Sequence, residues 1–309
     1  MFDHELFEDA RKEFLSYLLY TKGRSKTTCY VYRSDIGIWG KWLVEADKDW
    51  LNAKYPDVEQ FAAWQMRERG IKAHIVNRRI SALSTFYRWL VRNGIVETDP
   101  VALAEKPRRP LRIPMWLERE EQAKLEATIK DRRNIPINVF GNNKAKMAET
   151  RRRYEMLFGL LLNSGLRISE ALGLKASDVR LVDGAAKSVR VIGKGDKERL
   201  VPLPGAFGAV FGFWLKDRNR TEFVFARAPG QKAVSPQAAR GYLRLMLDKA
   251  GIEKKISPHK LRHTYATNLL NAGAELVDIN TLLGHESSAT TQIYTNVGQE
   301  RMEKVVGRL

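Results

Sequence analysis

Apolar side chains recur every three or four residues through the first hundred positions, and this spacing predicts amphipathic helices. The expected helices cover residues 3–20, 25–45, 56–70 and 73–92, with glycine or Asn93-Gly94 at most of their ends. We therefore expect a compact four-helix domain over residues 1–96. Its expected inward side chains are Leu6, Phe7, Ala10, Phe14, Leu18, Tyr30, Ile36, Trp39, Leu43, Val58, Phe61, Trp64, Met66, Ile75, Ile80, Leu83, Phe86, Trp89 and Leu90.

Residues 97–114 form the expected linker, because four prolines in this stretch deny a regular helix. The stretch is also basic, so it could cross a DNA backbone as well as join two domains. The side chains that make it basic are Lys106, Arg108, Arg109 and Arg112.

Residues 115–309 mix helical and alternating patterns, which predicts a second domain of mixed α/β type. Helices are expected at 117–129, from about 151, from 236, from 258 and at 276–283. Residues 187–203 alternate as a hairpin, and residues 223–225 predict a short strand. The polar residues 131–150 are expected to be a surface loop or insertion. Residues 299–309 are amphipathic but too short to persist alone, so they should dock somewhere.

The net charge of the chain limits the classes of function that the protein can have. The 53 Lys and Arg residues against 36 Asp and Glu residues give a formal net charge of +17, spread along the whole length. Such an excess favours a nucleic-acid partner, with an anionic membrane or plain solubility as alternatives. One cysteine, Cys29, excludes an intramolecular disulfide and a cysteine-rich metal site. The chain shows no signal-peptide pattern, so a reducing cytoplasm is expected.

Two stretches of the second domain place chemically versatile residues at short intervals. Ser257 and Pro258 are expected to cap and open a helix on which His259 and Arg262 share one face. Arg167 follows a glycine-containing turn, and Glu170 is spaced to orient it.

Three further signals accompany them. Gly284 should end the helix over 276–283, and His285 follows directly. Tyr294 comes nine residues later in a stretch rich in Ser and Thr, and Lys194 lies in the expected hairpin turn. Each residue alone is more often structural or solvated than chemical.

Taken together, these strings resemble the boxes of the tyrosine recombinase family, and they look most like the Xer-type recombinases and simple mobile-element integrases. The matching strings are Arg167-Ile168-Ser169-Glu170, Gly193-Lys194-Gly195, His259-Lys260-Leu261-Arg262, Leu283-Gly284-His285 and Tyr294. The length of residues 131–150 departs from the usual Xer connection, which leaves a mobile-element recombinase open. By this resemblance, the family's six active-site roles fall on Arg167, Lys194, His259, Arg262, His285 and Tyr294, with Glu170 as the accessory acid.

The resemblance also implies an architecture and a reaction. A helical, SAM-like core-binding domain and a catalytic domain would form a C-shaped clamp on double-stranded DNA. Four subunits would exchange strands through a Holliday junction at two sites, with residues 299–309 docked on a neighbouring subunit. Cleavage would leave a 3′-phosphotyrosine and a free 5′-hydroxyl.

The expected site suits phosphoryl transfer. Arg167 and Arg262 can match the charge that builds on the non-bridging oxygens, because guanidiniums offer forked donors and stay charged. An ordinary phenol has a pKa of about 10, so the nucleophile Tyr294 needs help to ionise at neutral pH. His259 is the expected general base for it.

The remaining roles follow from the leaving group and the phosphate. Lys194 would protonate the leaving 5′ oxygen, and His285 would donate a hydrogen bond to the phosphate. Neither a cluster of acidic residues with metal spacing nor a P-loop accompanies these residues, so no metal or cofactor is expected.

Other basic residues are candidates for DNA contacts, although solvated surface charge is the commoner case. They are Lys22, Arg24, Lys26, Arg78, Arg79, Arg88, Arg108, Arg109, Arg112, Arg240 and Arg244. Two alternative functions share the scaffold: a type IB topoisomerase that relaxes DNA as a monomer, and a non-catalytic DNA-binding regulator. The terminal amphipathic segment argues against the first, and the full set of six residues argues against the second.

Overall fold

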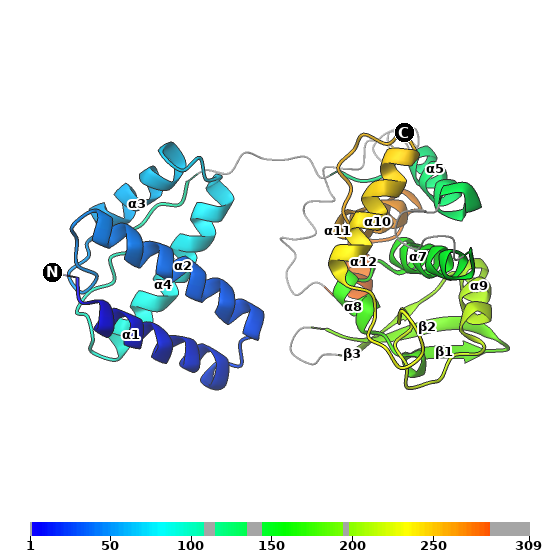
Figure 1. Cartoon of the computed structure of the whole chain (residues 1–309), viewed down its shortest axis with the longest axis horizontal. Helices are drawn as coiled ribbons and strands as arrows, with labels where there is room; N and C mark the ends of the chain where they lie inside the picture. The colour runs from blue at the N-terminus through cyan, green and yellow to red at the C-terminus, as the bar shows by residue number, and fades with distance from the viewer. Residues whose placement is uncertain (1, 108–114, 135–143, 194–197, 285–309) are drawn as a thin grey trace. The chain divides into compact units, whose positions relative to one another are not determined.

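The computed structural model describes residues 2–107, 115–134, 144–193 and 198–284. The chain divides into two compact units, Met1–Arg112 and Ile113–Leu309, and each has its own apolar core (Figure 1). The first unit is helical and the second combines helices with a three-stranded sheet, which confirms the expected fold class. In the part of the chain that is described, no helix has the length and apolar character needed to cross a membrane.

The first unit contains the four predicted helices. They are α1 (His4–Ser16), which continues into a π-helical turn (Tyr17–Thr21), α2 (Lys26–Glu45), α3 (Tyr55–Arg67) and α4 (Ala73–Arg92). Side-chain oxygens cap two of them, because Asp3 accepts from the backbone N–H of Leu6 and Ser25 accepts from that of Thr28. Aromatic rings fill the core between the helices, with Trp39, Phe61 and Phe86 fully buried.

Three expected core residues of this unit lie at the surface. Tyr30 is 74% exposed, and Leu6 and Met66 are also exposed. Tyr30 precedes Ile36 by six residues, and at 3.6 residues per turn this puts it roughly a third of a turn away from the buried stripe of α2. The helix pattern was therefore right, but the position of Tyr30 on it was wrong.

The first half of the expected linker belongs to the first unit. Val96 and Val101 are buried in its core, and Ala104 packs against the same core. The side chain of Asn77 on α4 also donates a hydrogen bond to the carbonyl of Pro107 at 2.9 Å. The chain therefore stays on this unit well beyond residue 97. Arg108, Arg109 and Arg112 lie outside the described residues.

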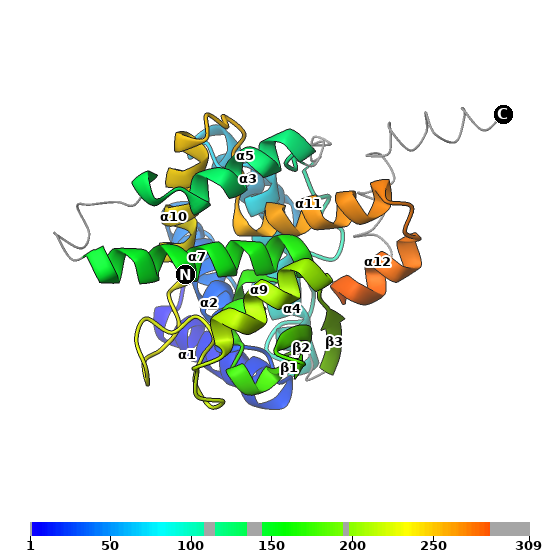
Figure 2. The same cartoon turned by 90° about the vertical axis from the view of Figure 1, so that its right-hand side faces the viewer.

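The second unit is arranged around α7 (Lys144–Ser164), which α5, α9 and α11 flank (Figure 2). The sheet has the order β1-β2-β3 and is antiparallel throughout. The elements of this unit, besides α7, are α5 (Arg119–Lys130), α8 (Ile168–Gly173), β1 (Val179–Val182), β2 (Ala185–Ile192), β3 (Glu198–Pro202), α9 (Gly205–Leu215), α10 (Pro236–Lys249), α11 (Pro258–Asn271) and α12 (Leu276–Leu283).

The structure corrects the expected loop over residues 131–150, because α7 begins at Lys144. The first turns of α7 contain many charged residues, and two arginines there form ion pairs within the helix. Arg151 pairs with Glu155 at 2.9 Å, and Arg153 pairs with Glu149 at 2.6 Å, each one helical turn apart. Both arginines are buried. A polar and largely exposed sequence thus begins a helix here, with two buried arginines paired within it, and apolar spacing does not reveal such a start.

Two elements were not predicted, and one prediction was wrong. The hairpin over 187–203 is confirmed as β2 and β3, but β1 adds a third strand to it. Residues 223–225 are not a strand, since only isolated bridges join Lys175 to Phe223 and Ala226 to Ala233. The helix α9 was missed because its sequence contains three glycines, which are poor helix formers.

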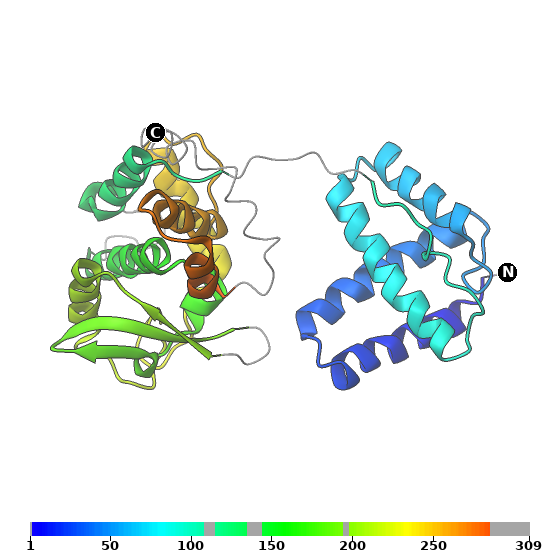
Figure 3. The same cartoon turned by 180° about the vertical axis from the view of Figure 1, so that it is seen from behind.

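Two of these glycines explain why α9 lies directly on the sheet (Figure 3). A Cβ atom at Gly208 would lie 2.2 Å from the carbonyl oxygen of Ala186, and one at Gly212 would lie 2.1 Å from that of Gly184. The absent side chains let the helix backbone approach the backbone of the sheet, so the glycines set this packing distance.

We predict that Gly212→Ala destabilises the protein by about 1–3 kcal/mol, because the new methyl group meets backbone atoms that cannot move aside cheaply. The matched control is Gly241→Ala on α10, where a Cβ meets nothing within 4 Å. There alanine should gain about 0.5–1 kcal/mol through its better helix propensity. Urea-induced unfolding measures both changes, and equal effects at the two positions would contradict this account of α9.

Candidate active site

The turn between α7 and α8 can be built only with glycine at position 165. Gly165 has a φ of +62°, and a Cβ there would lie 2.4 Å from the Tyr265 ring and 2.7 Å from the Leu283 side chain. This close packing directs the chain from the buried end of α7 to Arg167, which occupies the N-cap position of α8. The predicted turn is therefore confirmed, and it places Arg167 beside the elements that follow.

Glu170 holds Arg167 as the sequence predicts, and it also holds a second arginine. Its carboxylate accepts from the backbone N–H and from Nη1 of Arg167, both at 2.8 Å. Arg199 of β3 donates to the same carboxylate through Nη1 and Nη2 at 3.1 and 2.9 Å. Burial raises the pKa of Glu170, but the hydrogen bonds and charges of Arg199 and Arg167 outweigh burial and leave that pKa below its ordinary value.

Arg262 of α11 is the most buried cation of the site, with 1% of its surface exposed. Its guanidinium donates to the carbonyl of Gly165 at 2.9 Å and to the carbonyl of Leu283 at 2.6 Å. These bonds join the turn after α7 to the last turn of α12. A buried charge of this kind is stable only with such acceptors around it.

His259 lies one turn before Arg262 on α11, as predicted. Ser257 and Pro258 do occupy the N-cap and first positions of this helix, but the Ser257 side chain makes no capping bond, so that detail was wrong. His259 is exposed, and its ring stands edge-on to His263 with centroids 4.8 Å apart. Desolvation of the imidazole and the nearby charges of Arg262 and Arg167 lower the pKa of His259. Arg262 on the same helix donates to the carbonyl of Gly165, two residues before Arg167, so the three residues come from adjoining parts of the fold.

The electrostatics of this site favour an anion. Arg167 is partly exposed, with 40% of its side chain open to solvent, while the side chains of Glu170 and Arg199 are only 7% and 15% exposed. A lowered pKa keeps His259 neutral near pH 7, so its imidazole can accept a proton. The described residues thus combine a partly exposed guanidinium, a buried guanidinium and a proton acceptor.

Three predicted site residues, Lys194, His285 and Tyr294, lie outside the described residues. The same holds for residues 299–309. Gly284 is described, and it ends α12 in the left-handed conformation with a φ of +63°, as predicted. Among the residues that are described, no group of three or more His, Cys, Asp or Glu side chains could hold a metal ion.

The basic candidates for DNA contacts differ in exposure. Most described ones are exposed, namely Lys22, Arg24, Lys26, Arg78, Arg88, Arg240 and Arg244. Arg79 is the exception, because its side chain is only 13% exposed and donates to Gln65 at 2.5 Å. The prediction that Arg79 faces DNA does not fit this inward position.

Arg199 is the site residue that sequence reasoning missed. Arg199 of β3 pairs with Val191 of β2, and Val191 is buried. An apolar residue would be expected at such a position of a strand. Its Nε donates to the carbonyl of Leu282 at 3.3 Å, which links the hairpin to α12. A charged residue at an inward position of an alternating strand was the available signal.

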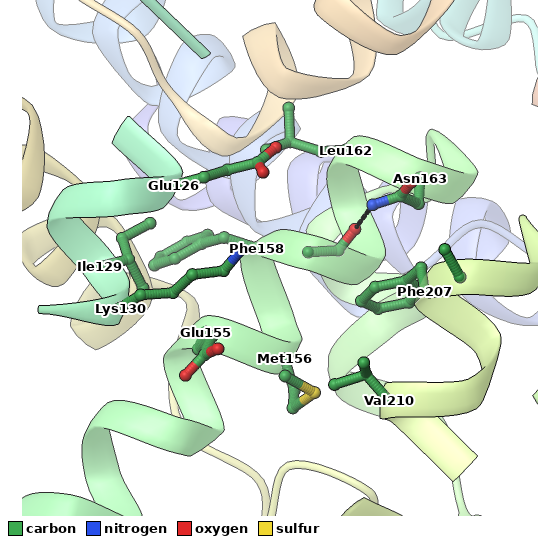
Figure 4. Close-up of a pocket in the computed structure, with 12 residues that line it drawn as sticks. Glu126, Ile129, Lys130, Glu155, Met156, Phe158, Leu162, Asn163, Phe207 and Val210 are labelled. Atoms are coloured by element: carbon green, nitrogen blue, oxygen red, sulfur yellow. Dashed lines mark hydrogen bonds between the residues drawn. The ribbon is translucent and has the colours of Figure 1, made fainter. Parts of the chain in front are cut away.

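A separate apolar cavity of about 380 Å³ lies between α5, α7 and α9 (Figure 4). Ile129, Phe158 and Phe207 point into it, and Asn163 at its edge donates to the carbonyl of Gly159 at 2.9 Å. None of the predicted site residues lines this cavity. It is therefore distinct from the arginine-rich site, although the C-terminal half of α7 contributes to its lining.

Family models match both units of the chain. The model described as "Phage integrase family" matches residues 141–301, which contain all six predicted catalytic residues. The model described as "Phage integrase, N-terminal SAM-like domain" matches residues 12–94, the helical part of the first unit.

Whole-length relatives agree with these models. The chain is 36% identical over 305 residues to tyrosine recombinase XerD of Proteus mirabilis, covering 94% of this chain and 90% of that protein. It is 33% identical over 311 residues to tyrosine recombinase XerC of Oceanobacillus iheyensis, covering 97% and 94%. A solved structure of XerH recombinase bound to its difH substrate shares the fold, with a TM-score of 0.73 at 21% identity over 91% of this chain and 79% of that one. The chain is therefore a member of the phage integrase family of tyrosine recombinases.

Proposed function

We propose that this protein is a site-specific recombinase that breaks and rejoins DNA through a 3′-phosphotyrosine on Tyr294. The observation that supports this best is the joint placement of Arg167, Arg262 and His259 by the α7–α8 turn and α11. Two guanidiniums beside a proton acceptor suit a phosphodiester, whose transition state gains negative charge on its non-bridging oxygens.

Each predicted site residue has its own role in the proposed reaction. Arg167 and Arg262 stabilise the developing charge, and removal of one such donor raises the barrier by about 3–4 kcal/mol in comparable sites. His259 accepts the phenol proton as Tyr294 attacks, and Lys194 protonates the leaving 5′ oxygen. His285 donates to the phosphate, and Glu170 keeps Arg167 in position. The phosphotyrosine bond conserves the energy of the phosphodiester, so rejoining needs neither a nucleotide nor a metal ion.

DNA is the partner in this proposal, and the assembly is a homotetramer on two recombination sites. Residues 1–96 would supply the core-binding domain, residues 97–114 the connection and residues 115–309 the catalytic domain. Residues 299–309 would dock on a neighbouring subunit through Met302, Val305, Val306 and Leu309, which fall at helical spacing. The reaction would take place in the cytoplasm, where the DNA is. The relatives named above are recombinases, so nothing in them favours a topoisomerase or a regulator.

The nucleophile can be tested with a nicked duplex that carries the recombination site. Wild type should give a protein–DNA adduct that resists SDS, and Tyr294→Phe should give none, because phenylalanine has no oxygen to form the ester. The matched control is Tyr265→Phe, a buried tyrosine of α11. An adduct that persists in Tyr294→Phe would remove Tyr294 from its role.

Deletion of residues 299–309 tests the docking of the terminal segment. We expect binding to a single DNA site to be unchanged and the pairing of two sites to weaken, because only the latter needs a neighbouring subunit. Native gel electrophoresis with one-site and two-site substrates measures both. Recombination at the wild-type rate after the deletion would contradict docking between subunits.

The role of Glu170 predicts a pH dependence. Its pKa is lowered in the folded protein from an ordinary 4.5, so its stabilising effect is present above that pH and is lost as the pH falls through the folded-state pKa. Glu170→Gln should therefore cost about 1–3 kcal/mol of unfolding free energy near pH 7 and progressively less in acid. Glu253→Gln, at an exposed position, is the matched control. Urea unfolding across this pH range measures the effect, and a constant difference would argue against the ion pairs.

A further inference from the structure

The outer face of α4 carries an uninterrupted polar stripe. Its members are spaced by four and three residues in turn, which is the spacing of one helix face, and all are at least partly exposed. The opposite face is buried in the core of the first unit. The stripe consists of His74, Arg78, Ser81, Thr85, Arg88 and Arg92.

One residue of this stripe, Arg78, forms an ion pair with a buried acid, Asp35. Asp35 of α2 has a side chain that is 0% exposed, and its Oδ1 accepts from Nη2 of Arg78 at 2.7 Å. Nε of Arg79 lies 3.6 Å from the same oxygen. Burial raises the pKa of Asp35, and the charges and hydrogen bonds of the two arginines act against burial.

Arg78 and Arg79 differ in how far their side chains are exposed to solvent. Arg79 is mostly buried and is also bonded to Gln65, so its guanidinium is enclosed between α2, α3 and α4. Arg78 is 51% exposed, and among the described side chains it is paired with Asp35 alone. One carboxylate thus faces two cations, and the excess positive charge reaches the surface at Arg78.

We propose that Asp35 is a positioning residue that holds Arg78 as a fixed pair of N–H donors for two acceptors on duplex DNA. The acceptors are either the O6 and N7 atoms of a guanine or two phosphate oxygens. This inference rests on the proposed function in that DNA is the ligand, but it concerns recognition and not strand exchange.

The physical reason lies in the flexibility of arginine. A free arginine on a helix surface samples many rotamers, and ordering it on DNA costs conformational entropy. The bond to buried Asp35 orders the guanidinium before DNA arrives. It also offsets part of the charge, so the contact depends on the direction of the donors more than on general attraction to the backbone.

The experiment uses the full chain as Tyr294→Phe, so that only binding is read, with a pool of randomised duplexes as the probe. Selection gives the preferred sequence, and titration of the selected duplex gives affinity and its salt dependence. In this background we compare three substitutions. Arg78→Lys keeps the positive charge but removes the paired N–H donors of the guanidinium, and it is compared with Asp35→Asn and Arg78→Gln. Glu8→Gln is the matched control, because it removes a carboxylate paired with Arg11 on α1, away from the stripe.

A guanine contact predicts that Arg78→Lys and Asp35→Asn both lose the preference at one base pair, with affinity for the selected duplex reduced about tenfold or more. A phosphate contact predicts an unchanged preference, a uniform loss of affinity, and a salt slope that falls by about 0.9 in Arg78→Gln. Either result supports the positioning role, provided that Asp35→Asn has no further effect on affinity when Arg78 is already glutamine.

The inference is overturned if Arg78→Lys binds and selects like its parent, or if the effects of Asp35→Asn and Arg78→Gln simply multiply. Arg78→Lys changes an exposed side chain, so it tests the proposal even if Asp35→Asn fails to fold. Failure of the proposed function looks different, because the wild type would then select no sequence and form no covalent adduct.

Discussion

The candidate active site depends on one buried guanidinium. Arg262 reaches from α11 to the carbonyl of Gly165 on one side and to the carbonyl of Leu283 on the other. Each carbonyl comes from the end of a different helix, where backbone acceptors are left without intrahelical partners. The charge is therefore stabilised by groups that themselves need donors. These hydrogen bonds join α7, α11 and α12, and the side chains of Tyr265 and Leu283 pack so closely there that position 165 has no room for a Cβ atom.

Two further arginines, Arg167 and Arg199, extend this network of hydrogen bonds toward the sheet. Glu170 is shared by Arg167 and Arg199, so one buried carboxylate fixes one arginine from the α7–α8 turn and one from β3. Arg199 in turn bonds to the carbonyl of Leu282, next to the carbonyl that Arg262 uses. The same device recurs in the first unit, where Asp35 serves Arg78 and Arg79. In both places a buried acid orders arginines that carry more charge than it cancels.

The sequence predicted most helices because apolar residues at helical spacing reflect burial on one face. It placed Tyr30 on the wrong face because an aromatic residue near the expected stripe looks the same whether it points in or out. The start of α7 escaped detection because it is polar and largely exposed, with ion pairs such as Arg153–Glu149 in place of an apolar stripe. The helix α9 escaped because its glycines serve packing on the sheet and not flexibility. In the site, Arg167, Glu170, His259 and Arg262 were identified from their spacing together with the family resemblance of their strings, whereas Arg199 comes from a strand and contacts Glu170 only in the folded protein.

The end of α12 has a consequence for control of the site. This helix has only eight residues, and the carbonyls of its last two, Leu282 and Leu283, receive Arg199 and Arg262. Fraying of that final turn would deprive both guanidiniums of an acceptor in a single event. In the proposed reaction, activity would thereby depend on the local folding equilibrium of one short helix, so a contact that stabilises or destabilises this terminus would change activity without contacting the DNA.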